Sequence, residues 1–98
     1  MEIKANQNYI VRTASAGVFF GKVKEYNKDE ITMTDVRKIW YWDGACAVEQ
    51  LALDGVTKPD ECKLTVVISE MVIAEPIQII PCTEKASKIL SEINIWKR

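Results

Sequence analysis

The chain has 98 residues, a length typical of one small domain. Hydrophobic residues make up 48% of it and charged residues 28%, which is a globular rather than a disordered composition. The 13 lysines and arginines nearly balance the 14 aspartates and glutamates, for a net charge of -1. No bulk electrostatic attraction to nucleic acid or to an acidic membrane is therefore expected.

Histidine is absent, which removes the side chain that most often acts as an acid, a base or a metal ligand near neutral pH. The three cysteines, Cys46, Cys62 and Cys82, are too few and too widely spaced for a secreted disulfide framework or a zinc site. Residues 1–8 do not resemble a signal peptide, and no run approaches the roughly 18 apolar residues of a membrane helix. We therefore expect a cytoplasmic protein that is not an enzyme and has no metal or cofactor.

The first half of the chain predicts four strands joined by short turns. The β-prone, alternating segments span residues 9–13, 18–26, 31–34 and 37–42, after a loose arm formed by residues 1–8. Ser15-Ala16-Gly17 and Asn27-Lys28-Asp29 supply the turns, the second of them inside a hairpin. A bend or bulge near Asp35 is expected between the third and fourth strands.

A change of hydrophobic period after residue 42 predicts the first helix. Asp43 is expected to cap it, because a carboxylate can accept from the free amides of the first turn. Val48 and Ala52 lie on its apolar stripe. Gly55 is expected to end the helix.

The remaining sequence predicts two more strands and a second helix. Residues 63–80 are the most β-prone segment, with breaks expected near Ser69-Glu70 and Pro76. Thr83 is expected to cap the last helix. The buried face of that helix follows the i, i+3, i+4, i+7 pattern of Ala86, Ile89, Leu90 and Ile93.

This order of elements predicts an α+β fold. We expect a single domain over residues 1–98, in which two helices pack on a small, strongly curved antiparallel sheet. The predicted order is β-β-β-β-α-β-β-α.

The most unusual local feature is the run Trp40-Tyr41-Trp42. On a strand, Trp40 and Trp42 point to one face and Tyr41 to the other. The run is then either core with a covered second face, or an exposed aromatic surface that stacks a planar ligand or anchors a subunit contact. Arg37 and Lys38 precede it, and arginine beside aromatic rings suits phosphate and base recognition.

The turn at Ser15-Ala16-Gly17 is a second candidate. Its small residues let a ligand approach, and turn amides can hold an anion, although a plain tight connection between strands is the simpler explanation. Arg12 is close in sequence. The hypothetical ligand-binding residues are therefore Arg12, Ser15, Gly17, Arg37, Trp40 and Trp42.

Two strings carry a resemblance to a known family. They are Ser15-Ala16-Gly17-Val18-Phe19 with Gly21, and Trp40-Tyr41-Trp42-Asp43-Gly44-Ala45. With these strings the chain resembles an uncharacterised family of small tailed-phage and prophage proteins of unknown function. The resemblance implies a phage protein located in the host cytoplasm, and small phage proteins without catalytic groups often act by binding.

Several functions remain open from the sequence. The first is a non-enzymatic phage accessory protein, a homo-oligomer that counters host defence by sequestering a nucleotide signal or blocking a host effector protein. The alternative is a structural or assembly protein that acts only through protein–protein contacts. Binding to nucleic acid is disfavoured by the net charge.

Overall fold

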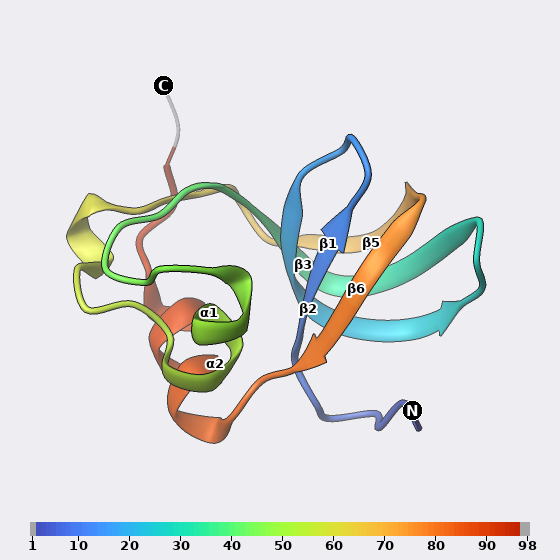
Figure 1. Cartoon of the computed structure of the whole chain (residues 1–98), viewed down its shortest axis with the longest axis horizontal. Coiled ribbons are helices and arrows are strands. Elements are labelled where there is room, and N and C mark those ends of the chain that lie inside the picture. Colours follow the sequence, from blue (N-terminus) through green and yellow to red (C-terminus); the bar gives the residue numbers. More distant parts are fainter. Residues whose placement is uncertain (1, 97–98) are drawn as a thin grey trace.

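The structure is a computed structural model that describes residues 2–96. It confirms the α+β class and the predicted order of elements, with the predicted third and fourth strands joined into one (Figure 1). The strands are β1 (Tyr9–Thr13), β2 (Val18–Tyr26), β3 (Glu30–Tyr41), β4 (Lys63–Leu64), β5 (Ile68–Ala74) and β6 (Pro76–Pro81). The helices are α1 (Val48–Asp54), the short 3-10 helix η1 (Pro59–Glu61) and α2 (Glu84–Glu92).

All six strands belong to one antiparallel sheet. The order is β4-β3-β2-β1-β6, and β5 pairs with β3 outside this path. The long β3 therefore has two partners on one side, β5 along its first half and β4 along its second. The sheet curls strongly but does not close, and both helices lie on one side of it (Figure 1).

Glu75 forms the corner between β5 and β6, and its backbone bonds to the β1–β2 turn and to the β2–β3 turn. Its backbone adopts a left-handed conformation with φ 56°. Its N–H donates to the Asp29 carbonyl over 2.8 Å, and its own carbonyl accepts from the Ala14 N–H over 3.0 Å. This corner holds the two ends of the curved sheet together.

The bulge predicted near Asp35 is present and lies within β3. Asp35 has a φ of 46°, and the β2–β3 register shifts between Phe20 and Lys22. Gly21 lies opposite this irregularity, where a Cβ atom would approach the Val36 Cα within 2.8 Å. Only glycine at position 21 therefore allows the bulged backbone to come this close.

The strands bury side chains on both faces of the sheet. Tyr9 and Val11 of β1 belong to one cluster and Ile10 to another, as their alternation predicts. The enclosed cluster lies inside the curl and contains only residues of the sheet among its buried members: Tyr9, Val11, Phe19, Val23, Ile31, Met33, Val36 and Ile73. The helix-covered cluster contains Ile10, Phe20, Ile39 and Leu64 from the sheet, together with residues of α1 and α2 and their flanking loops.

The predicted start of the first helix is wrong. Helix α1 begins at Val48 with Ala47 as its cap, and no side chain caps it. The Asp43 N–H instead donates to the Cys62 sulfur, and the Asp43 carboxylate pairs with Lys58 over 3.9 Å. Residues 43–47 therefore form a loop fastened to the segment around η1. The predicted stop at Gly55 is confirmed, with φ 73°.

The second half of the chain follows the predicted pattern with one displaced break. Ser69 and Glu70 lie inside β5, so a break there is wrong; the interruption falls instead at residues 65–67, between β4 and β5. The break before Pro76 is confirmed. Thr83 caps α2 as predicted, since its hydroxyl oxygen accepts from the Ala86 N–H over 3.1 Å.

Residues 2–8 of the N-terminal arm have no regular secondary structure, yet they contact the sheet. The Lys4 N–H donates to the Tyr9 hydroxyl over 3.0 Å. The Gln7 side chain donates to the carbonyl oxygens of Asn8 and Cys82, the latter over 2.6 Å. Ile3 packs against the enclosed cluster.

Candidate functional site

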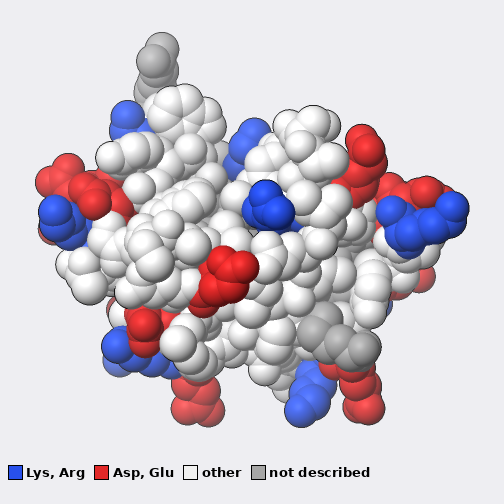
Figure 2. Space-filling view, viewed as in Figure 1, with Lys and Arg blue, Asp and Glu red and all other residues white. Residues whose placement is uncertain are grey.

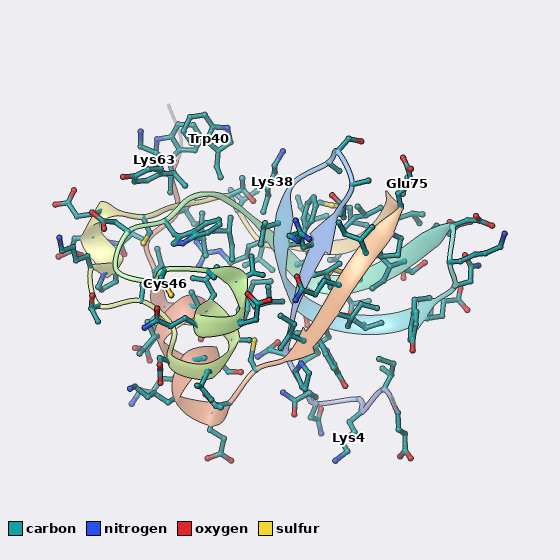
Figure 3. The ribbon with its side chains drawn as sticks, in the orientation of Figure 1. Lys4, Lys38, Trp40, Cys46, Lys63 and Glu75 are labelled. Atoms are coloured by element: carbon teal, nitrogen blue, oxygen red, sulfur yellow. The ribbon has the colours of Figure 1, made fainter. Side chains whose placement is uncertain are left out.

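An exposed group of aromatic side chains surrounds one lysine at the edge of the sheet. We call Trp40, Tyr41, Lys63 and Trp96 the aromatic patch (Figure 3). Trp40 is 55% exposed and Tyr41 is 47% exposed. Side chains this large and apolar contribute most to stability when buried, so two of them at the surface around one lysine make this the candidate site of the described residues.

Three segments that are distant in sequence build the aromatic patch. The end of β3 carries Trp40 and Tyr41, and β4 places Lys63 opposite Tyr41. Beyond α2 the chain returns beside β4, where Ile95 forms a parallel bridge with Leu64. The Trp96 N–H donates to the Leu64 carbonyl over 2.8 Å. This pairing stacks the Trp96 ring on Trp40 with centroids 4.9 Å apart and planes 27° apart.

Lys63 binds the patch together through its ammonium group. Its Nζ lies 5.3 Å from the ring centroid of Trp40, 5.9 Å from that of Tyr41 and 5.5 Å from that of Trp96. These distances are within the range of cation–π attraction, worth about 0.5–1 kcal/mol at an exposed site. The patch therefore has a positive charge held among three aromatic rings.

A recess of about 500 Å³ lies next to the patch along the chain. Its lining includes Cys62, which precedes Lys63, and Asn94, which lies just before Trp96. Its lining is mixed, with Pro59, Ile89 and Ile93 as apolar members and Asp60 and Glu92 as acidic ones. The recess therefore adjoins the aromatic patch through neighbouring residues of the chain but contains none of the patch residues.

Arg37, one of the predicted ligand-binding residues, is not at the surface. It is only 3% exposed and lies under the end of α2. Its Nε donates to the Thr65 carbonyl over 2.9 Å, and its Nη1 donates to the Leu90 carbonyl over 3.0 Å. A cation at a helix C-terminus is favourable, because the last carbonyls carry partial negative charge.

The burial of Arg37 leaves its charge without a carboxylate partner among residues 2–96. Its Nη2 has no hydrogen-bond partner among these residues, and the burial lowers the pKa of the guanidinium. Arg37 joins β3, the loop after β4 and α2, so its position here is structural.

Arg12 lies on a different surface from the aromatic patch. It is exposed on β1, and its Nε donates to the Gln78 side chain over 3.2 Å. Gln78 in turn donates to the Glu49 carboxylate over 2.8 Å, which ties β6 to α1. This bond, and to a smaller extent the charge of Arg12, lowers the pKa of Glu49.

The predicted turn residues lie beside Lys38. Ser15 is exposed, and Gly17 has a φ of 112° with its carbonyl accepting from the Thr13 N–H and hydroxyl. A Cβ atom on Gly17 would approach the Lys38 Cε within 2.9 Å, so the lysine stem covers the turn. Figure 3 shows Lys38 beside this turn, apart from Trp40 and Lys63.

Trp42 is half-buried and packs against the helix-covered cluster. Its indole N–H donates to the Ala45 carbonyl over 3.2 Å, which holds the loop before α1. Of the six predicted site residues, only Trp40 belongs to the aromatic patch. The structure does not bring Arg12, Arg37 and Trp42 together with it.

None of the three cysteines belongs to the aromatic patch. Cys46 is exposed on the loop before α1, whereas Cys62 and Cys82 are buried. Burial raises the pKa of Cys82 to about 12, which keeps its thiol protonated and unreactive. Within residues 2–96, no three His, Cys, Asp or Glu side chains come together as a metal site would require.

Charged side chains of both signs are scattered over the molecule. In Figure 2 they lie mostly around the rim of the visible face, where lysines and arginines alternate with carboxylates and form no continuous basic stripe. No helix within the described part of the chain has the length and apolar character needed to cross a membrane.

A family model for a domain of unknown function, DUF6948, matches residues 6–90. The chain belongs to this family. The match covers all six strands and most of α2 but ends before Trp96. Neither the curated proteins nor the solved structures include a match to the chain.

Of the aromatic patch, the sequence alone predicts only Trp40 as a site residue. Tyr41 is noted only as part of the aromatic run, and the sequence singles out neither Lys63 nor Trp96. Lys63 follows a buried cysteine in a β-prone segment and has no distinguishing neighbour. Trp96 lies beyond the last predicted helix, and only the parallel bridge to β4 brings it to Trp40. The available signal was a lone tryptophan three residues after the buried face of a helix, which predicts no particular partner.

Proposed function

We propose that this chain is a non-enzymatic binding protein that attaches to a protein partner through the aromatic patch. The observation that carries the proposal is the stacked pair of Trp40 and Trp96, assembled at the surface from distant segments around Lys63. Tryptophan and tyrosine are enriched among the residues that dominate binding energy at protein interfaces. The adjoining recess is a concave surface, which can improve shape complementarity with a partner.

The proposed activity is binding alone, without a catalytic step. The chain has no histidine, the base that most often activates a cysteine, and two of its three thiols are buried. In the phage setting that the sequence strings suggest, the protein would be located in the host cytoplasm and its partner would be a host effector of defence, blocked by the attached protein. A purely structural or assembly role would use the same kind of protein contact.

A nucleotide is the second candidate partner, favoured by one feature of the patch. The outer face of an exposed indole can stack a base while the neighbouring Lys63 ammonium pairs with a phosphate. Sequestration of a nucleotide signal would then replace the blocking of a protein.

The test compares Trp40→Ala with Leu53→Ala. Both side chains are exposed, Leu53 at 61%, but Leu53 lies on α1 and outside the aromatic patch. Proteins captured from host lysate are identified, purified and titrated against wild type and both variants. We expect Trp40→Ala to weaken binding by at least about tenfold and Leu53→Ala to leave it unchanged. Equal affinities of the two variants would contradict the proposal.

The nucleotide arm of the test uses calorimetry with linear and cyclic nucleotides and follows tryptophan fluorescence. A stacked base is expected to quench the indole emission in wild type but not in the Trp40→Ala variant. Nucleotide binding that is lost in Trp40→Ala would favour sequestration over attachment to a protein.

A further inference from the structure

Two of the strands at the edges of the sheet, β5 and β6, are built differently. Strand β6 begins and ends with proline, at Pro76 and Pro81, which have no amide hydrogen to offer a neighbouring strand. Strand β5 spans seven residues, Ile68–Ala74, with no proline and no lysine. Among residues 2–96, β5 pairs only with β3, so its other edge presents free backbone donors and acceptors.

The side chains along β5 also lack the usual protection of an edge. Its outward face carries Ile68, Glu70, Val72 and Ala74, and Val72 is 60% exposed. The only charge of the strand, Glu70, is already paired with Lys24 of the same chain over 3.3 Å. Natural edges are usually blocked by charge, proline or bulges. The β5 edge has no proline and no bulge within its paired length, and its one charge is paired within the same chain, so the edge is suited to receive another strand.

We propose that β5 pairs antiparallel with β5 of a second copy of this chain, around a two-fold axis at Met71. Such an axis runs perpendicular to the sheet, so outward-facing residues stay on one face across the interface. Met71 then opposes the partner's Met71, Glu70 opposes the partner's Val72, and Ile68 opposes the partner's Ala74. All seven residues of each strand are paired.

The second copy is the occupant because the strand is complementary to itself in this register. No two like charges oppose each other, and each Glu70 keeps its own Lys24. An axis at Glu70 would place the two Glu70 carboxylates directly opposite, which is unfavourable. An axis at Val72 would pair only five residues of each strand. The register at Met71 is therefore the one that the charges and the strand length favour together.

The contact between two β5 strands would be the interface of the homo-oligomer that the sequence predicts. It does not depend on what binds the aromatic patch. Strands β4 and β5 pair with opposite halves of β3, so the aromatic patch and the proposed contact use different parts of the sheet edge. A dimer formed in this way carries two aromatic patches, which raises the avidity for a multivalent partner.

The experiment measures the mass of the full chain by sedimentation over a wide range of concentration. Val72→Glu places a second carboxylate opposite the partner's Glu70, whereas Val72→Lys places an opposite charge there. Because two symmetry-related pairs change together, we expect Val72→Glu to raise the dissociation constant of the dimer about tenfold or more. Val72→Lys should leave it equal or lower.

Ile77→Glu is the matched control, since Ile77 is equally exposed but lies on the proline-bounded β6. It should not change the mass. Circular dichroism checks that each variant folds. We expect it to, because both substituted side chains are exposed.

A wild type that stays monomeric at every concentration would overturn the proposal. So would a dimer that Val72→Glu leaves intact, one that Val72→Glu and Val72→Lys weaken equally, or one that Ile77→Glu disrupts. Trp40→Ala should leave the dimer unchanged while weakening the partner of the aromatic patch, so the two proposals can fail separately.

Discussion

The enclosed cluster and the helix-covered cluster differ in chemistry as well as in position. The enclosed cluster consists of apolar residues and Tyr9, whose buried side chains come from strands alone. The helix-covered cluster includes the thiols of Cys62 and Cys82 and packs against Trp42, and the buried guanidinium of Arg37 bonds to α2 beside it. Arg37 therefore joins segments that are distant in sequence, since it lies on β3 and bonds to the loop after β4 and to α2.

The largest expected effect tests the enclosed cluster. Met33→Ala removes a fully buried side chain from a region that strands enclose on several sides. We expect a loss of about 2–5 kcal/mol in the free energy of unfolding, because the rigid sheet cannot collapse into the cavity. Urea denaturation measures it. A loss below about 1 kcal/mol would show that the enclosed cluster repacks easily and would remove the contrast between the clusters.

Substitutions of Arg37 test the helix-covered cluster. Arg37→Ala removes two hydrogen bonds to carbonyl groups and leaves a cavity, so we expect a loss of about 2–3 kcal/mol. Arg37→Met fills the space without burying a charge, and we expect it to cost about 1 kcal/mol or less. Urea denaturation of both variants provides the comparison. Equal losses would show that the charge, rather than the packing, stabilises this region.

Alkaline pH tests the same cluster through Cys82. Its pKa is raised by burial to about 12 in the folded protein, above the value near 9 of a free thiol. The folded state then holds the proton more tightly than the unfolded state, so stability is full below about pH 9 and falls as the pH rises. We expect wild type to lose about 1 kcal/mol more than Cys82→Ala between about pH 9 and pH 10.

Thermal unfolding of wild type and Cys82→Ala at each pH gives this difference, and the variant corrects for pH effects that do not involve Cys82. Identical pH profiles would mean that the Cys82 thiol is accessible to water. Alkylation then offers a direct check, since Cys46 alone should react in the folded protein.

The smallest effect concerns the bulge at Asp35, on the strand β3 that contributes to both clusters. Asp35→Gly relieves a left-handed conformation and loses only an exposed ion pair with Lys22. We expect the free energy of unfolding to rise by up to about 1 kcal/mol, reduced slightly because the ion pair is lost. Asp35→Asn removes the same charge without the relief and should change the stability by less than about 0.5 kcal/mol. A destabilised Asp35→Gly protein would show that the bulge is not strained.

Most of the fold could be predicted because its signals are local. The alternation in β1, the bulge at Asp35, the stop at Gly55 and the cap at Thr83 are all encoded by neighbouring residues. The start of α1 could not be predicted, since Asp43 is held by Cys62, which lies 19 residues further along the chain. The same limit explains why β5 runs through Ser69 and Glu70, where pairing with β3 overrides their weak preference for strands.

The candidate site was predicted only in part for a related reason. A tryptophan on a strand shows that one face is aromatic, but not which segment lies against it. Trp40 and Trp42 share a predicted face, yet β3 ends between them, so Trp42 turns into the helix-covered cluster while Trp40 remains exposed. Arginine near aromatic residues suggested a ligand contact at Arg37. However, α2 lies over that position, and the Arg37 guanidinium donates to the Leu90 carbonyl in the last turn of that helix.

The pairing of β1 with β6 sets the timing of folding. Tyr9 is opposite Pro81 and Arg12 is opposite Gln78, so the first strand finds its outer neighbour only when nearly the whole chain is present. Pairings this distant in sequence slow folding, because the loop must close before the contacts stabilise it. During synthesis the β2–β3 hairpin can form early with β1, but one side of β1 stays unpaired until β6 leaves the ribosome. A nascent chain arrested before residue 76 is therefore expected to be the aggregation-prone form of this protein.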